Sequence, residues 1–305
     1  MSEASPVSVV ICTIGRPDLI GAAAGSVLAN RYPNFELTVV DQSKDDSTRR
    51  ALEAFAGDPR YHYLHLDRVG LSAAYNAGIA ASRSDVLAFT DDDCVAPPTW
   101  VSAVVNALER HPDVELLYGQ TLVAPALKNG PGEVPSMPIA AEEKIGEGHG
   151  FRIAGMGANF ALRRRLIDRI GGFDEALGGG GPLKSSQDFD FQFRTYRAGA
   201  VCLLTPDVWV DHYGVRNSEQ WPKTLEAYGV GDGAFYWKHV RCGDLLALRL
   251  FATRLARGFA REALNPIRRK PSNWPYYRSC LTGMWRSMKF RIDRDRRLYK
   301  PAGSG

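Results

Sequence analysis

The sequence has few cysteines and no long apolar run. Its 305 residues include five cysteines, which are widely spaced and form no CxxC pair, so it indicates neither a disulfide framework nor a zinc site. No apolar stretch approaches the roughly 20 residues that a membrane-spanning helix needs. The first residues also lack the basic and apolar regions of a signal peptide. We therefore expect a cytoplasmic protein, with no membrane-spanning segment.

Charge is unevenly distributed along the chain. The formal net charge is only +4, but the segment from Arg241 to Gly305 has sixteen basic and four acidic residues. This segment is therefore strongly basic, whereas the first 240 residues are acidic overall. Such asymmetry indicates that the two parts of the chain face different partners. With 45% hydrophobic residues, the sequence has ample material for a core, which argues against disorder.

Short strands alternate with helices through the first 120 residues. Runs of β-branched and aromatic residues predict strands at 7–13, 35–41, 61–66 and 86–91. Apolar residues at helical spacing predict helices at 17–30, 47–56, 71–81 and 98–111. This alternation predicts an open, mostly parallel sheet with helices on both faces. Ligands bind such sheets at the carboxyl ends of the strands, where Thr13, Asp41 and Asp91 fall.

The pattern changes after the first 120 residues. Proline and glycine crowd residues 124–150, which predicts either a functional loop, such as a lid, or a disordered segment. Regular patterns then resume, with a helix near 188–199 and a strand at 201–212. From about Glu219 the sequence predicts amphipathic helices, broken at 265–275. We therefore expect a catalytic domain at 1–218, with a nucleotide-binding half (1–120) and an acceptor half (121–218), followed by a basic helical tail at 219–305.

Three consecutive carboxylates lie at the end of the strand at 86–91. Asp91, Asp92 and Asp93 would repel one another unless a cation holds them together, so they indicate a divalent metal and a phosphate-bearing ligand. Taken alone, the triplet could also be a solvated acidic turn. The motifs around it favour the first interpretation.

Eight short motifs occur in an order that resembles the family 2 glycosyltransferases, which have the GT-A fold. The resemblance runs from about Val7 to Tyr213 and rests on VSVVICTIGRP, VVDQSKDDS, RVGLSAAYNAGIAAS, FTDDDC, GANFALRR, IGGFDE, QDFDFQFR and the late DH. It implies an inverting, non-processive bacterial type of enzyme. Such an enzyme moves a sugar from a UDP-, GDP- or dTDP-sugar to an acceptor hydroxyl, with Mg²⁺ or Mn²⁺ on the diphosphate. Cell-surface polysaccharide or glycolipid synthesis is the role that this type implies.

The resemblance also assigns roles to individual carboxylates. Asp93 corresponds to the direct metal ligand. Asp91 corresponds to the ribose contact and is also a candidate metal ligand, while Asp92 bridges either role. His212 resembles the histidine that completes the metal site, although a lone histidine can also simply pack. Asp188 resembles the catalytic base, and a position near a helix N-terminus would keep it ionised.

Further residues resemble the nucleotide contacts of the family. Thr13, Arg16 and Asp41 correspond to contacts in the first loop and after the second strand. Gly70 and Ser72 can bring backbone amides to the nucleotide at a helix start, and Asn76 would order that loop. The chain departs from the family pattern in having Tyr75 where arginine is common and Gln187 where glutamate is usual. These departures leave open a catalytically silent sugar-nucleotide-binding or scaffold protein. A sugar-nucleotide pyrophosphorylase is a poorer match, because CTIGRPDL lacks a glycine-rich basic loop.

The basic tail interleaves apolar and aromatic residues with cations. This composition suits an anionic membrane surface on the inner face of the cell membrane, and a lipid-linked acceptor would explain it. The alternative is that these helices pack on the catalytic domain or on a second subunit in a homodimer. No recognised nucleic-acid-binding motif is present. The run Gly229–Gly233 has no preceding strand, so we interpret it as a turn or an acceptor-side loop rather than a dinucleotide motif.

Overall fold

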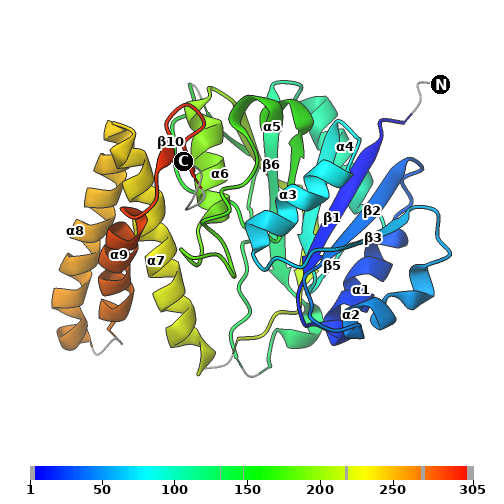
Figure 1. The fold of residues 1–305 in the computed structure, drawn as a ribbon, viewed down its shortest axis with the longest axis horizontal. Coiled ribbons are helices and arrows are strands. Elements are labelled where there is room, and N and C mark those ends of the chain that lie inside the picture. The colour runs from blue at the N-terminus through cyan, green and yellow to red at the C-terminus, as the bar shows by residue number, and fades with distance from the viewer. Residues whose placement is uncertain (1–3, 131, 147, 217–218, 269–271, 301–305) are drawn as a thin grey trace. The chain divides into compact units, whose positions relative to one another are not determined.

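The computed structural model describes residues 4–130, 132–146, 148–216, 219–268 and 272–300 (Figure 1). These residues form two compact units. The first unit contains residues up to 69 together with 73–173 and 191–216. The second contains 70–72, 174–190 and the described residues from 219 onward.

A mixed sheet forms the centre of the first unit. Its strands are β1 (Val7–Thr13), β2 (Phe35–Asp41), β3 (Tyr61–His65), β4 (Val86–Asp91), β5 (Cys94–Val95), β6 (Val114–Val123), β7 (Glu143–Ile145), β8 (Asn159–Arg163) and β9 (Val201–His212). The order is β3-β2-β1-β4-β8-β6-β9-β5, and β7 pairs with β9. The first four strands are parallel, as the sequence predicts. Later strands are mixed, because β8 runs antiparallel to both β4 and β6.

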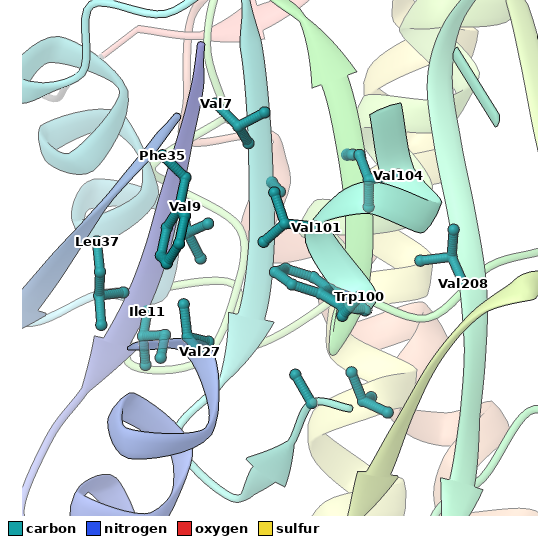
Figure 2. Close-up of a cluster of buried hydrophobic side chains, with 14 of the residues drawn as sticks. Val7, Val9, Ile11, Val27, Phe35, Leu37, Trp100, Val101, Val104 and Val208 are labelled. Atoms are coloured by element: carbon teal, nitrogen blue, oxygen red, sulfur yellow. The ribbon is translucent and has the colours of Figure 1, made fainter. Parts of the chain in front are cut away.

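Helices cover both faces of this sheet. They are α1 (Pro17–Leu28), α2 (Ser47–Ala51), α3 (Leu71–Ala81), α4 (Trp100–Arg110), α5 (Arg164–Ile170) and α6 (Gln187–Arg197), with short 3₁₀ turns at Glu53–Phe55 and Pro125–Leu127. Val9 and Ile11 belong to a core cluster with residues of α1 and α4 (Figure 2). Val10 points to the opposite face, where a Cβ added to Gly78 of α3 would lie 2.5 Å from its Cγ1. Because successive strand residues alternate between faces, both faces of β1 are buried, as expected for a covered parallel sheet.

Several predicted boundaries differ from the structure. The helix predicted at 47–56 ends at Ala51 and continues as a 3₁₀ turn. Within the proline- and glycine-rich segment, β7 pairs with β9 and Met137 forms a bridge to Thr121 of β6. Part of this segment is therefore held by backbone hydrogen bonds to the sheet, which side-chain periodicity does not reveal.

The second unit contains the helices of the tail. They are α7 (Gln220–Arg241), α8 (Leu245–Arg268) and α9 (Trp274–Ser287), followed by a two-stranded sheet of β10 (Ile292–Asp293) and β11 (Leu298–Tyr299). The predicted break at 265–275 is shorter in the structure, since α8 continues to Arg268 and α9 begins at Trp274. Pro275 lies in the first turn of α9, where a proline needs no N–H partner. Residues 269–271 lie outside the described part. Among the described helices, none has the length and apolarity that crossing a bilayer requires.

The interpretation of Gly229–Gly233 as a turn or loop was wrong, because the run lies inside α7. Gly229 and Gly233 are one helical turn apart and face α9. A Cβ on Gly233 would lie 1.8 Å from the Cys280 carbonyl oxygen, and one on Gly283 would lie 2.0 Å from that of Val230. These glycines therefore allow the backbones of the two helices to approach closely.

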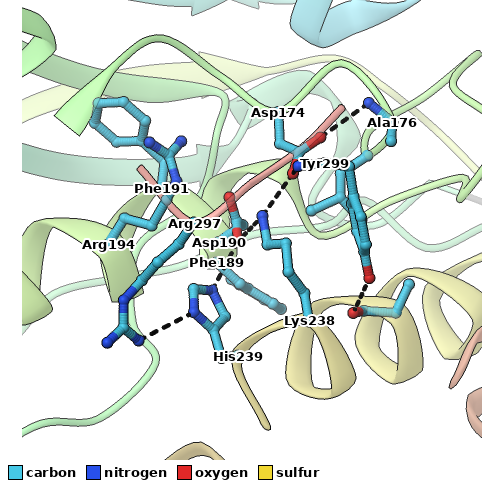
Figure 3. A network of polar contacts seen from close by, with 12 residues as sticks. Asp174, Ala176, Phe189, Asp190, Phe191, Arg194, Lys238, His239, Arg297 and Tyr299 are labelled. Atoms are coloured by element: carbon cyan, nitrogen blue, oxygen red, sulfur yellow. Dashed lines mark hydrogen bonds and ion pairs between the residues drawn. The ribbon is translucent and has the colours of Figure 1, made fainter. Parts of the chain in front are cut away.

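Buried charges occupy the interior of the second unit (Figure 3). The Lys238 ammonium on α7 lies 2.6 Å from Asp174 Oδ2 and 2.6 Å from Asp190 Oδ1. His239 Nε2 lies 2.9 Å from the same Asp190 oxygen. All four side chains are almost completely buried, so each charge depends on the others to offset the cost of desolvation.

Candidate functional site

The strand register brings the predicted polar residues to one edge of the sheet. Thr13 pairs with Asp41 across β1 and β2, and Cys12 pairs with Asp91 across β1 and β4. The carboxyl ends of three parallel strands therefore meet at this edge, as the sequence predicts. The acidic triplet continues from β4 toward β5, and β5 pairs with the end of β9, where His212 lies.

Asp92 and Asp93 are held by the loop after β1. The Thr13 hydroxyl donates to Asp92 Oδ2 at 2.7 Å. Arg16 Nη1 donates to Asp92 Oδ1 at 2.8 Å and to Asp93 Oδ2 at 2.9 Å. One guanidinium thus bridges two carboxylates that would otherwise repel each other.

His212 is fixed on both sides of its ring. Its Nε2 lies 3.2 Å from Asp93 Oδ1, and its Nδ1 lies 2.7 Å from the carbonyl oxygen of Pro135. A carbonyl can only accept, so Nδ1 carries the proton of that bond. Nε2 is therefore the ring nitrogen that faces Asp93. The Tyr213 amide also donates to the Asp93 carbonyl at 2.8 Å, which fixes the backbone of the pair.

Burial and mutual repulsion act unequally on the three carboxylates. Burial raises the pKa of Asp91 well above its usual range, and the charges of Asp93 and Asp92 raise it further. Burial also raises the pKa of Asp92, although Arg16 and Thr13 oppose this shift. Asp93 behaves differently: burial alone would raise its pKa, but hydrogen bonding and charge from His212, together with Arg16, lower it. Asp93 is therefore the member of the triplet that most strongly favours the ionised form.

The donor atoms around Asp93 suit a divalent metal ion. Asp93, Cys94 and His212 each offer a ligand atom, and all three atoms lie within 4.8 Å of one another. Oxygen and imidazole ligands suit Mn²⁺, and oxygen suits Mg²⁺. The Cys94 thiol is a poor ligand for either ion, because burial raises its pKa well above the usual range and keeps it protonated. Asp93 and His212 are therefore the residues that fit such an ion.

Gly214 completes this corner and was not identified from the sequence. A Cβ at this position would lie 2.5 Å from Asp93 Oδ2 and 2.7 Å from His212 Nε2. The glycine therefore leaves open the space into which both ligand atoms point. Only a three-dimensional structure reveals this role. The contributions of the Pro135 carbonyl and of Arg16 as a bridge between carboxylates were also missed, because no sequence spacing encodes them.

Asp41 lies at the next strand end and is fully buried. Its Oδ1 accepts the Ser43 amide at 2.8 Å, and its Oδ2 accepts the Tyr63 hydroxyl at 2.7 Å. Burial, followed by the hydrogen bond and charge of Asp41, raises the pKa of Tyr63 well above its usual range. The phenol therefore stays protonated as a donor and holds Asp41 in place.

Asn76 is tied to a turn within the first unit. Its Nδ2 donates to the Phe173 carbonyl at 3.0 Å, and its Oδ1 accepts the Phe173 amide at 2.8 Å. Tyr75, the departure from the family pattern, is 1% exposed and packs edge-on against Phe89 and Phe160. In this structure Tyr75 thus belongs to the aromatic core.

The remaining candidates belong to the second unit. The Leu71 amide, directly after Gly70, donates to the Gly179 carbonyl at 2.8 Å. The buried Ser72 hydroxyl donates to the Leu177 carbonyl at 2.8 Å. Asp188 lies in the first turn of α6, as the sequence predicts, and its Oδ1 accepts the Phe189 amide at 2.9 Å. These contacts fix the segment around Leu177 and Gly179 and the start of α6 within their own unit.

Comparison with known proteins finds sequence similarity to glycosyltransferases. Residues 8–131 match Glycosyl transferase family 2. The chain is 28% identical over 180 residues to a glucosyl-dolichyl phosphate glucuronosyltransferase of Haloferax volcanii, covering 56% of this chain and 57% of that protein. It is 25% identical over 221 residues to the succinoglycan biosynthesis protein ExoM of Rhizobium meliloti, covering 68% of this chain and 67% of that protein.

Solved structures support the same fold. A mannosyltransferase, PcManGT from Pyrobaculum calidifontis in complex with GDP-Man and Mn²⁺, aligns with a TM-score of 0.63 at 16% identity, covering 93% of this chain and 88% of that one. S. aureus TarS 1–349 in complex with UDP aligns with a TM-score of 0.55 at 19% identity, covering 74% and 65%. The predicted fold class is therefore confirmed: the chain has the GT-A fold, and its residues 8–131 match Glycosyl transferase family 2.

Proposed function

We propose that this family 2 glycosyltransferase moves a sugar from a nucleotide-diphosphate donor to an acceptor hydroxyl, with inversion and with Mg²⁺ or Mn²⁺ at Asp93 and His212. The observation that carries the proposal is the convergence of Asp93, His212 and Arg16 at the carboxyl edge of a nucleotide-binding type of sheet. The mannosyltransferase neighbour was solved with GDP-Man and Mn²⁺, and the TarS neighbour with UDP. GDP-Man belongs to the proposed donor class, and UDP is the nucleoside diphosphate part of such a donor.

Each proposed role follows from the local chemistry. The bound ion would neutralise charge that develops on the departing diphosphate. Asp93 and His212 hold that ion, and Arg16 keeps Asp93 and Asp92 close together. Asp91, Thr13 and Asp41 lie at strand ends that suit the nucleoside.

Asp188 is proposed as the general base. The acceptor oxygen bonds to the anomeric carbon while the bond from that carbon to the diphosphate oxygen breaks, and Asp188 takes the acceptor proton. One displacement inverts the anomeric configuration. The helix start at Gln187 favours the ionised carboxylate that this role requires.

We further propose that the acceptor is a saccharide or a lipid-linked saccharide, presented at an anionic membrane surface. On α9, Trp274, Leu281 and Trp285 are spaced at helical intervals and are 48%, 47% and 60% exposed. The exposed Arg278 falls within the same stripe, and the Lys289 ammonium lies 4.9 Å from the centre of the Trp285 ring. Apolar and cationic groups on one helix face suit insertion among anionic lipid headgroups. The name of one relative refers to a dolichyl phosphate, which is a lipid carrier, and the name of the other refers to the biosynthesis of succinoglycan, which is a polysaccharide. Both names support an acceptor of the proposed class.

The central test is calorimetry with nucleotide sugars in the presence and absence of Mn²⁺. A panel of UDP-, GDP- and dTDP-sugars first identifies the donor by binding and by metal-dependent hydrolysis.

Asp93→Ala should then abolish metal-dependent donor binding, because the diphosphate would face the remaining carboxylates without the ion. Asp168→Ala, an exposed aspartate on α5, serves as the matched control and should bind normally. Unchanged donor affinity in Asp93→Ala would remove this residue from the metal site. Donor binding without turnover on any acceptor would instead identify a sugar-nucleotide-binding protein.

A further inference from the structure

A second pocket lies in the first unit, over the carboxyl-terminal halves of β6 and β9. Its volume is about 570 Å³, within the range of small-molecule sites. Its lining includes side chains from three neighbouring extended segments: Gln120, Leu122, Ser136, Pro138, Trp209 and Asp211. Lys128 also lines it.

Strand register explains why these side chains share one face. Gln120 pairs with Trp209 and Leu122 with Asp211 in the parallel pairing of β6 and β9. On the other edge of β6, Thr121 bridges Met137, so the neighbouring Ser136 and Pro138 take the same face as the two pairs above.

The alternation also separates this pocket from the Asp93 cluster. Val210 and His212 alternate with Trp209 and Asp211 along β9, so their side chains point to the opposite face. Val210 accordingly belongs to the core cluster, and His212 points to Asp93. The pocket is therefore a separate site on the other side of the same strands.

The fold uses the polar groups of the pocket unequally. The Gln120 amide is engaged, because its Nε2 donates to the Pro206 carbonyl at 2.8 Å and its Oε1 accepts the Ile139 amide at 3.3 Å. Within the described residues, the Asp211 carboxylate accepts no hydrogen bond and forms no ion pair. Lys128 acts on it through charge alone, from beyond ion-pair distance. Trp209 is only partly buried, so part of its indole remains accessible. A partly buried carboxylate that the fold does not pair is costly unless a ligand supplies donors.

This combination selects for one class of ligand. A pyranose sugar has a face of C–H bonds that packs on an aromatic ring, and a rim of hydroxyls that donate to a carboxylate and accept from an ammonium. A phosphate-bearing ligand would be repelled by Asp211. A purely apolar ligand would leave that carboxylate desolvated and unpaired.

We propose that this pocket binds a pyranose unit of the acceptor or product saccharide, away from the site of transfer. Trp209 stacks on the ring and Asp211 accepts from its hydroxyls, while Lys128 donates to them. The saccharide class rests on the proposed function. The pocket would hold a growing or branched saccharide on the enzyme between encounters with the donor.

The test is saturation-transfer NMR on the full chain without nucleotide or metal. The probes are the methyl glycosides of glucose, galactose, mannose and N-acetylglucosamine, together with maltose and cellobiose. At least one probe should bind, with saturation strongest on one face of the ring. Trp209→Leu and Asp211→Asn should each weaken that binding at least tenfold. Tyr228→Leu, which alters an exposed aromatic residue of α7, should leave it unchanged.

Two outcomes would overturn the proposal. One is the absence of saturation in all six probes with the wild-type chain. The other is equal binding by Trp209→Leu and Asp211→Asn variants whose thermal unfolding matches the wild type. Mn²⁺-dependent donor binding, measured on the same variants, should persist. If the wild type showed no Mn²⁺-dependent donor binding, the transferase proposal would be contradicted. The NMR result would still decide separately whether the pocket at Trp209 binds a sugar.

Discussion

At the residue scale, neighbouring cationic side chains stabilise the acidic triplet even in the absence of a metal ion. Arg16 and His212 supply cations to Asp92 and Asp93, so part of the repulsion is offset before any ion binds. Burial lowers the pKa of His212, but the hydrogen bond and charge of Asp93 raise it by more. The Asp93 carboxylate therefore favours the protonated form of the His212 ring. A metal ion would replace the Nε2 proton, so its binding should release a proton to solvent.

Gly214 provides a sharp test of where the ion binds. Gly214→Ala should weaken Mn²⁺-dependent donor binding by about tenfold or more, or ~1.4 kcal/mol, because its methyl group would meet both ligand atoms. The backbone at Gly214 has no left-handed φ, so alanine should fold normally. Calorimetry with the donor and Mn²⁺ measures the effect. Gly57→Ala is the matched control, since a Cβ there meets nothing within 4 Å. Normal affinity in Gly214→Ala would place the ion elsewhere.

Asp188→Asn separates catalysis from binding. The substitution keeps size and hydrogen-bonding capacity but removes the basic oxygen. Donor affinity should stay nearly intact, while kcat should fall by about 10²-fold or more, as is typical when a general base is lost. Steady-state turnover and donor calorimetry on the same preparation measure the two quantities. Turnover close to that of the wild type would rule out Asp188 as the base and direct attention to other carboxylates near the acceptor.

At the scale of single elements, the sequence predicted some segments to the residue and missed others. β1, β2, β4 and α3 begin and end as predicted, because their apolar runs are bounded by turn residues and their local preferences agree with burial. The glycines of α7 were misread, because glycine usually interrupts helices. Here close packing on α9 outweighs that cost, and no local pattern reveals a partner helix more than 40 residues away. Likewise, Thr13 and the acidic triplet were identified from their strand ends, whereas Gly214 and the Pro135 carbonyl depend on tertiary contacts.

The contact between α6 and α7 within the second unit should make stability depend on pH. Burial lowers the pKa of His239 to about 4, although its hydrogen bond to Asp190 opposes this shift, so this histidine is neutral in the folded chain. The unfolded chain protonates it near pH 6.5. The unfolded state therefore binds more protons between these values, and stability falls as the pH drops below about 6.5. At pH 5 the loss from this residue should be about 2 kcal/mol.

Denaturant unfolding at pH 7.5 and pH 5 measures this dependence. His239→Gln removes the titrating group but keeps a side chain that can donate to Asp190, so its stability should change less between the two pH values. His149→Gln, at an exposed position, should show the wild-type dependence. If His239→Gln and the wild type lose equal stability on acidification, His239 does not titrate as proposed and surface carboxylates account for the loss.

At the scale of the whole molecule, charge divides between the two compact units much as it divides along the sequence. The acidic first 240 residues supply the sheet and the metal-binding carboxylates, whereas the basic segment after Arg241 supplies α8, α9 and the final two-stranded sheet. On α9, one face packs on α7 through Cys280 and Gly283, and the opposite face exposes the tryptophans. A helix with one packed face and one exposed apolar, basic face is typical of contact with another surface. Local patterns along the chain do not distinguish a lipid surface from a protein surface in such a case, since both select the same residues.

Vesicle co-sedimentation of the full chain distinguishes these partners. We expect binding to vesicles that contain anionic lipid and little binding to neutral vesicles. Binding should weaken between low and high salt, because salt screens the attraction of the basic residues but leaves apolar insertion intact. The double substitution Trp274→Ser and Trp285→Ser should reduce binding severalfold at both salt concentrations, since it removes insertion while keeping every positive charge. Val69→Ser, which alters a 45% exposed residue of the first unit, should bind like the wild type. Equal sedimentation of the double variant and the wild type, or no sedimentation of either, would contradict a membrane role. The exposed face of α9 would then be assigned to contact with a second subunit, and sedimentation equilibrium should show a dimer.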